Sequence, residues 1–160
     1  MSDSVDNMND SVLAMLGRAR VYCASAEQCV WSVSQKLETW GASSDDAAMV
    51  IERLVEEGYL DERRYARAYC ESKMLRGGWG RMKVVYQLRA KRLPREVIDE
   101  AVAAVDDEAY MEVLREAAEK KWSSLRDGDA AVRRRKTASF LAQRGYTMDE
   151  ISQTLKNIKL

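Results

Sequence analysis

The sequence contains no histidine, and this absence excludes catalytic triads that depend on an imidazole. Cysteine is sparse, with three residues (Cys23, Cys29 and Cys70) and no CxxC pair. A zinc site built from cysteine and histidine is therefore not expected. A small, odd number of cysteines fits a reducing compartment, so we expect a cytoplasmic protein.

Proline and glycine are also scarce, with one proline and eight glycines in 160 residues. All-β folds need turn residues every ten or so positions, so this composition favours helices. No apolar run approaches the roughly 18 residues that span a bilayer, and no signal peptide is visible, so we expect no membrane partner. The polar start "MSDSVDNMNDS" predicts a flexible tail over residues 1–11.

The net charge is zero, but the charges are segregated along the chain. Residues 1–60 carry 4 basic and 10 acidic side chains, a net of −6, and residues 61–95 carry 11 and 3, a net of +8. Residues 96–129 carry 4 and 11, a net of −7, and residues 130–160 carry 7 and 2, a net of +5. Blocks of this kind indicate surfaces with different partners, although helical proteins also have ordinary charged faces.

An internal repeat aligns on three leucines, Leu37, Leu88 and Leu141, which are 51 and 53 residues apart. Six positions after each leucine stands a residue suited to a helix start: Ser43, Pro94 and Thr147. An acid follows two positions later, where it complements the positive end of the helix dipole. Apolar residues then recur with the i, i+4, i+7 spacing of an amphipathic helix.

Further helical stretches precede each leucine. They fit residues 12–25, 30–37, 62–76, 81–88, 109–125 and 133–141. The sequence therefore predicts an all-α fold, an elongated array of about nine helices arranged as three tandem three-helix repeats. The predicted repeats cover residues 12–60, 61–107 and 108–160.

Basic residues in the 61–95 block, together with a shorter patch at 133–136, are the main candidates for binding a partner or nucleic acid. Arg63 and Arg67 are spaced i, i+4, and Arg89 and Arg92 are spaced i, i+3, so each pair is predicted to share a helix face. Such pairs can grip phosphates or attract an acidic protein surface. The full candidate set is Arg63, Arg64, Arg67, Lys73, Arg76, Arg81, Lys83, Arg89, Lys91, Arg92, Arg133, Arg134, Arg135 and Lys136.

The stretch "EEGYLDERRYA" reads as a helix end with Gly58 in the left-handed region, followed by Asp61 as the cap of the next helix. The tyrosines among the basic residues, Tyr65, Tyr69 and Tyr86, can stack on bases, but helical spacing favours core positions. The "RGGWG" segment at 76–80 lacks the Lys-Ser or Lys-Thr of a phosphate loop and is predicted to be a flexible link between helices.

Several linked motifs resemble the bacterial regulatory protein RecX family. They are "GYLDERRYARAYCESKMLRGGWGRMKVVYQLRAKRLPREVIDEAV" at 58–102 and "FLAQRGYTMDEISQTL" at 140–155. The chain departs from the family where "KRLP" stands in place of the common Lys-Gly-Ile, which we interpret as a substitution at a helix start. It also has Cys29 where a serine cap is usual in the first repeat.

The resemblance implies tandem three-helix repeats and a regulatory role. RecX-like proteins bind the RecA filament on single-stranded DNA and inhibit its ATPase, strand-exchange and coprotease activities, and some bind single- or double-stranded DNA. The resemblance thus implies RecA as the partner, and we expect a monomer without cofactors. Two alternatives stay open: a nucleic-acid-binding protein acting through its own basic patch, and a helical-repeat adaptor with an unrelated partner. An enzyme is not expected, because no metal constellation or activated nucleophile is present.

Overall fold

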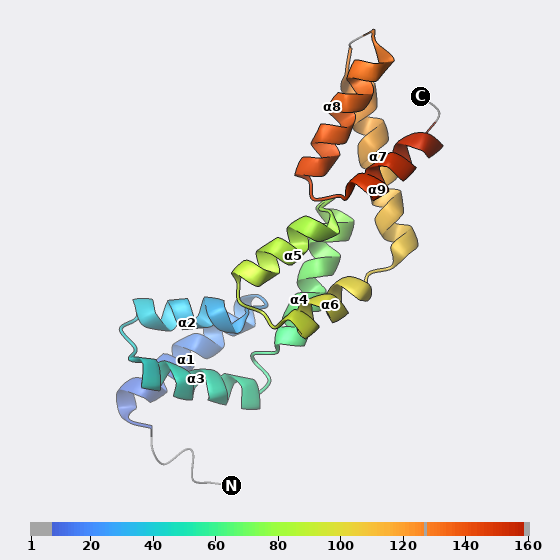
Figure 1. Cartoon of the computed structure of the whole chain (residues 1–160). Coiled ribbons are helices and arrows are strands. Elements are labelled where there is room, and N and C mark those ends of the chain that lie inside the picture. The colour runs from blue at the N-terminus through green and yellow to red at the C-terminus, as the bar shows by residue number, and fades with distance from the viewer. Residues whose placement is uncertain (1–7, 127, 159–160) are drawn as a thin grey trace. The chain divides into compact units, whose positions relative to one another are not determined.

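The computed structural model describes residues 8–126 and 128–158, so most of the tail predicted over residues 1–11 lies outside the described residues. Within these ranges the chain is all-α, as predicted, with nine α-helices, one π-helical turn and no strand. Figure 1 shows the helices in chain order. Their bounds are α1 Asp10–Ser25, α2 Val30–Thr39, α3 Ser44–Glu56, α4 Glu62–Glu71, the π-helical turn Ser72–Arg76, α5 Arg81–Ala90, α6 Arg95–Ala103, α7 Asp107–Ser124, α8 Ala130–Gln143 and α9 Met148–Asn157.

The chain divides into two compact units. The first comprises Met1–Tyr65 with Lys91–Leu93, and the second comprises Ala66–Ala90 with Pro94–Leu160. The predicted repeat boundaries at 60/61 and 107/108 stay a prediction.

The first unit is built on α1, α2 and α3, which pack against one another. Apolar side chains spaced three or four residues apart on these helices form its core, together with Leu60 in the turn after α3. These residues are Val12, Leu16, Ala19, Cys23, Val33, Leu37, Val50, Leu54 and Leu60. Each of them is less than a tenth exposed, so the core of this unit is continuous across all three helices.

A cluster of three charged side chains lies on the surface of the first unit. Glu57 accepts hydrogen bonds from Arg20 (Nε–Oε2, 2.8 Å) and from Arg53 (Nε–Oε1, 2.7 Å). The hydrogen bond from Arg20, and after it the one from Arg53, lowers the pKa of the Glu57 carboxyl from 4.5 to about 2. This carboxylate therefore links α1 to the end of α3.

The second unit contains the later part of α4, the π-helical turn and α5 to α9, with α7 packed on α8 and α9 and α5 packed on α6. Its largest buried side chains include Met74, Leu88, Ile98, Tyr110, Leu114, Leu141 and Ile151. The stretch predicted as one helix over 62–76 ends in the π-helical turn, where the Gly77 N–H donates to the Ser72 carbonyl (2.9 Å). Turns of this kind often mark functional sites.

Two glycines allow backbones of this unit to meet. The Gly80 N–H donates to the Arg144 carbonyl (2.8 Å), and the Met82 N–H donates to the Gly145 carbonyl (3.1 Å). A Cβ on Gly80 would overlap the Gly145 backbone, so only glycine fits there. The "RGGWG" segment thus links helices, as predicted, and it is anchored to the turn at 144–145. Its predicted flexibility stays a prediction.

The predicted helix starts are confirmed in detail. The Ser43 hydroxyl accepts from the Asp46 N–H (3.2 Å), and Thr147 forms a reciprocal capping box with Glu150. Pro94 occupies the N-cap of α6, and Asp61 Oδ1 accepts from the Arg64 N–H (3.1 Å).

The helix ends show a feature that the sequence prediction misjudged. Four residues after each repeated leucine the backbone is left-handed, with φ of 88° at Gly41, 62° at Arg92 and 98° at Gly145. Arg92 therefore occupies the place of a helix-terminating glycine. The interpretation of "KRLP" as a substitution at a helix start is wrong, because the changed residue follows the end of α5.

Candidate partner-binding surface

The structure distributes the fourteen candidate basic residues over several elements instead of one patch. Three lie on α4 (Arg63, Arg64, Arg67), two on the π-helical turn (Lys73, Arg76), three on α5 (Arg81, Lys83, Arg89), two in the following turn (Lys91, Arg92) and four on α8 (Arg133, Arg134, Arg135, Lys136). Several of these side chains have contacts that hold the fold, and others extend into solvent.

Arg64 secures the turn that precedes α4. Its Nε donates to Glu27 Oε1 (2.8 Å), and its terminal nitrogens donate to the carbonyls of Gly58 (3.2 Å) and Tyr59 (3.3 Å). Gly58 has φ of 79°, as the sequence predicted. Arg64 therefore satisfies carbonyls of the turn that follows α3, which is a structural role.

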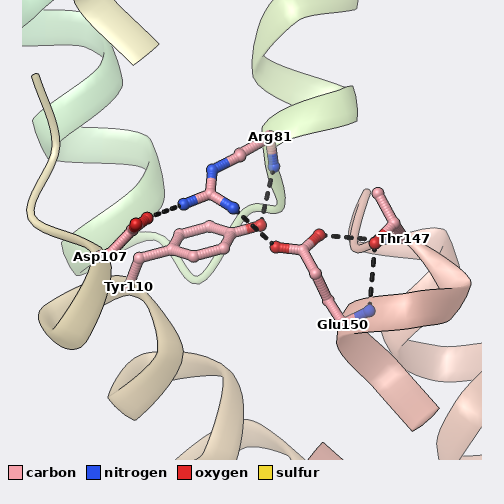
Figure 2. Close-up of polar contacts among 5 residues, drawn as sticks. All are labelled: Arg81, Asp107, Tyr110, Thr147 and Glu150. Atoms are coloured by element: carbon pink, nitrogen blue, oxygen red, sulfur yellow. Dashed lines mark hydrogen bonds and ion pairs between the residues drawn. The ribbon is translucent and has the colours of Figure 1, made fainter. Parts of the chain in front are cut away.

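Arg81 lies at the centre of a polar network in the second unit (Figure 2). Its guanidinium forms ion pairs with Asp107 and with Glu150 (3.1 Å), and its carbon lies 4.1 Å from the centre of the Tyr110 ring. Its backbone N–H donates to the Tyr110 hydroxyl (3.1 Å). The Thr147 N–H donates to the Glu150 carboxylate (3.0 Å), so the network joins the starts of α5, α7 and α9.

The tyrosines beside this network stay neutral. Burial raises the pKa of Tyr110 well above its ordinary value, and burial raises the pKa of Tyr146 to about 12. The two rings lie 5.6 Å apart. The two carboxylates therefore balance the charge of Arg81, and this arginine has a structural role in the second unit.

Two further candidates have partners within the second unit. Arg133 lies over the Trp122 ring (4.2 Å) and donates to the Trp122 carbonyl (2.9 Å), which ties α8 to the end of α7. Arg67 is largely exposed and pairs with Glu100 at 3.2 Å. Surface pairs of this kind contribute little to stability, so Arg67 can exchange its partner.

Lys73 and Lys83 meet at an aromatic side chain in the link between helices. Their ammonium groups lie 4.8 Å and 4.3 Å from the centre of the Trp79 ring, and Tyr69 meets the same ring edge-on at 6.3 Å. Trp79 is partly buried, so the indole fixes the positions of two cations at the surface.

The remaining candidates differ in exposure. Arg63, Arg76, Arg89, Arg92, Arg134, Arg135 and Lys136 are exposed, and Lys91 is partly buried beside Trp31 (5.9 Å). Arg63 and Arg67 lie one turn apart on α4, as predicted. The predicted helical pairing of Arg89 with Arg92 is wrong, because α5 ends at Ala90 and Arg92 adopts a left-handed conformation.

The three tyrosines also separate. Tyr65 is buried and Tyr69 is partly buried, in line with the prediction that they are core residues. Tyr86 is 71% exposed, so its assignment to the core is wrong. Helical spacing alone could not show this, because Tyr86 lies opposite the buried Val84 and Leu88 on α5.

Sequence reasoning missed one exposed apolar residue beside Tyr86. Met82 is 60% exposed and stands one turn before Tyr86 on α5. The signal was present in the repeat, because the positions that align with Val84 and Leu88 define the buried face of this helix.

Comparison with known proteins shows to which family the chain belongs. Two family models match the chain in order: the second three-helix domain of RecX over residues 61–102 and the third over residues 107–155. The chain belongs to the RecX family. It is 32% identical over 146 residues to the regulatory protein RecX of Pseudomonas fluorescens, covering 91% of this chain and 92% of that protein. It is 34% identical over 128 residues to that of Pelodictyon phaeoclathratiforme, covering 80% and 78%.

Solved RecX structures have the same fold. The crystal structure of RecX from Lactobacillus salivarius superposes with a TM-score of 0.84 at 18% identity, covering 93% of this chain and 97% of that one. Another crystal structure of a regulatory protein RecX gives a TM-score of 0.85 at 18% identity, covering 92% of this chain and 74% of that one. Among the residues described for this chain, none of the helices combines the length and apolar character of a membrane span.

Proposed function

We propose that this RecX-family protein binds the RecA recombinase filament on single-stranded DNA and inhibits its ATPase, strand-exchange and coprotease activities. The proposal rests on the ordered match to the second and third RecX domains and on the regulatory name that the relatives share. The protein acts in this account by binding, without catalysis of its own.

Exposed cations supply the attraction to the filament. The block over residues 61–95 has a net charge of +8, and a filament on DNA carries the phosphates of its strand. Arg76, Arg134 and Arg135 are exposed and suited to this role. Arg64, Arg81 and Arg133 are the weaker candidates of the original set, because their contacts stabilise the fold.

The test is the ATPase of the cognate recombinase on single-stranded DNA, titrated with this protein at substoichiometric ratios. We expect the hydrolysis rate to fall as the protein is added. The inhibition should persist when the concentrations of DNA and recombinase are raised together at a fixed ratio. An unchanged hydrolysis rate at equimolar protein would refute the proposal.

A second candidate function has a specific observation in its favour. Lys73 and Lys83 are held at the surface by Trp79, and an aromatic side chain among cations is typical of sites for single-stranded nucleic acid. In that case the protein should bind naked single strands with an affinity that falls steeply with salt, and inhibition should disappear when excess naked DNA competes.

A further inference from the structure

The outward face of α5 carries large side chains that the fold does not bury. Met82 is 60% exposed and Tyr86 is 71% exposed, and Arg89 follows on the same exposed side. We call these three residues the α5 stripe. The opposite face holds Val84 and Leu88, both fully buried, so the helix is already anchored without the stripe.

The internal repeat shows which positions on this helix the fold constrains. The position of Leu88 is leucine in all three repeats (Leu37, Leu88, Leu141), and every copy is fully buried. The position of Tyr86 is instead polar in the other two repeats, where Gln35 and Ser139 are both exposed. An aromatic ring at this position is therefore not a requirement of the repeat.

The position of Met82 varies in the same way. It is an exposed arginine on α8, Arg135, and a partly buried tryptophan on α2, Trp31. Single exposed apolar side chains are common, but Met82 and Tyr86 are neighbours on one helix face, so together they are a candidate interaction surface. Tyrosine, methionine and arginine are enriched in protein–protein interfaces relative to the remaining surface.

A groove borders the stripe. It has a volume of about 420 Å³ and is lined by Arg81, Val85, Asp99, Val102, Ala103 and Asp107, all within the second unit. Val85 stands three residues after Met82 and four before Arg89, so one wall of the groove adjoins the stripe. The groove thus offers apolar contact next to exposed apolar side chains.

The charges around this surface discriminate between classes of partner. Asp99 and Asp107 line the groove, and their side chains are 63% and 83% exposed. Asp99 pairs with Arg95 and Asp107 pairs with Arg81, so the groove has no surplus of positive charge that would attract a phosphodiester chain, and Met82 offers such a chain no hydrogen bond. A protein surface suits this region better. An apolar side chain of the partner would contact the groove, Met82 and Tyr86, and a carboxylate beside it would pair with Arg89.

We propose that the α5 stripe and its groove contact a protein subunit of the filament, which places an apolar side chain against Met82 and Tyr86 and a carboxylate against Arg89. This inference rests on the proposed function and assigns the protein-binding surface within it. Buried aromatic and arginine anchors carry most of the affinity of such contacts.

The experiment compares three variants with the wild type in the ATPase assay on preformed filaments. Met82→Ala/Tyr86→Gln removes the apolar part of the stripe and places at position 86 the residue that α2 has there. Arg89→Glu reverses the charge. Val21→Gln is the matched control, because Val21 is 72% exposed on α1 in the first unit.

We expect both stripe variants to raise the half-inhibiting concentration at least tenfold, and the control to leave it unchanged. The affinity for naked single-stranded DNA should be the same in all four proteins. Circular dichroism melts show whether each variant is folded. Arg89→Glu changes only a surface residue, so it still tests the inference if the double variant is destabilised.

The outcomes separate the inference from the proposed function. If the wild type inhibits and both folded stripe variants inhibit equally well, the inference is wrong and the proposed function stands. If the stripe variants lose affinity for naked DNA in proportion to inhibition, the surface binds nucleic acid and the protein assignment is wrong. If the wild type does not inhibit at all, the inference and the proposed function are both wrong.

Discussion

The conformation of Arg92 predicts that a glycine at this position stabilises the protein. Its backbone has φ of 62°, whereas the equivalent positions in the other repeats are Gly41 and Gly145, with φ of 88° and 98°. A left-handed conformation costs an L-residue with a Cβ about 1–2 kcal/mol. Glycine relieves this cost but makes the unfolded chain more flexible, which offsets about 0.4–1 kcal/mol.

The expected net effect of Arg92→Gly is a gain of about 0.5–1 kcal/mol in the free energy of unfolding. Loss of the exposed charge itself should matter little, since surface substitutions usually change stability by under about 0.5 kcal/mol. For a chain of this length the melting temperature should rise by about 2 °C. Thermal melts followed by circular dichroism and urea titrations measure both quantities.

The reverse substitution is the matched control. A Cβ at Gly41 would meet no atom within 4 Å, so Gly41→Arg tests the backbone conformation without a steric clash. It should destabilise the protein by about 1 kcal/mol. A lower melting temperature for Arg92→Gly, or an unchanged melting temperature for Gly41→Arg, would refute the claim that a residue with a Cβ lowers stability at this left-handed position.

Three more predictions test the account of the fold. Gly80→Ala should destabilise the protein by about 2 kcal/mol or more, because the new methyl group would overlap the backbone at Gly145, whereas Gly17→Ala, with open space around it, should not; urea titrations measure both. Arg81→Met should cost about 2 kcal/mol in the same titrations, because it leaves the largely buried Glu150 carboxylate without its cation, and a loss below about 0.5 kcal/mol would show that the network is dispensable. Glu57 has a folded-state pKa of about 2, below its ordinary value of 4.5, so its contribution to stability is present above pH 4.5 and is lost as the pH falls towards 2. Glu57→Gln should therefore lose less stability than the wild type over this range in pH-dependent melts, and parallel losses would contradict the assignment.

Much of the fold could be predicted because the signals are local. The caps Ser43 and Thr147 depend on residues a few positions apart, and the structure confirms them. Gly58 was also predictable, because glycine after an amphipathic stretch is typical of a left-handed helix end. At Arg92 the same signal was missing, since the conformation persists there without its usual residue.

The candidate surface was less predictable, because the environment of a charge depends on tertiary packing. Arg81 and Glu150 are 69 residues apart in sequence, and nothing near Arg81 indicates this partner. The exposure of Tyr86 depends on which face of α5 packs inward. Alignment of the repeats could have shown it, because Gln35 and Ser139 stand at the same position.

The most direct test of the central claim is a binding measurement on three immobilised targets: naked single-stranded DNA, free recombinase, and recombinase filament assembled on the same DNA with a non-hydrolysable nucleotide. We predict that this RecX-family protein binds the filament much more tightly than either component alone. Equal affinity for naked DNA and filament, with a steep dependence on salt in both cases, would contradict it.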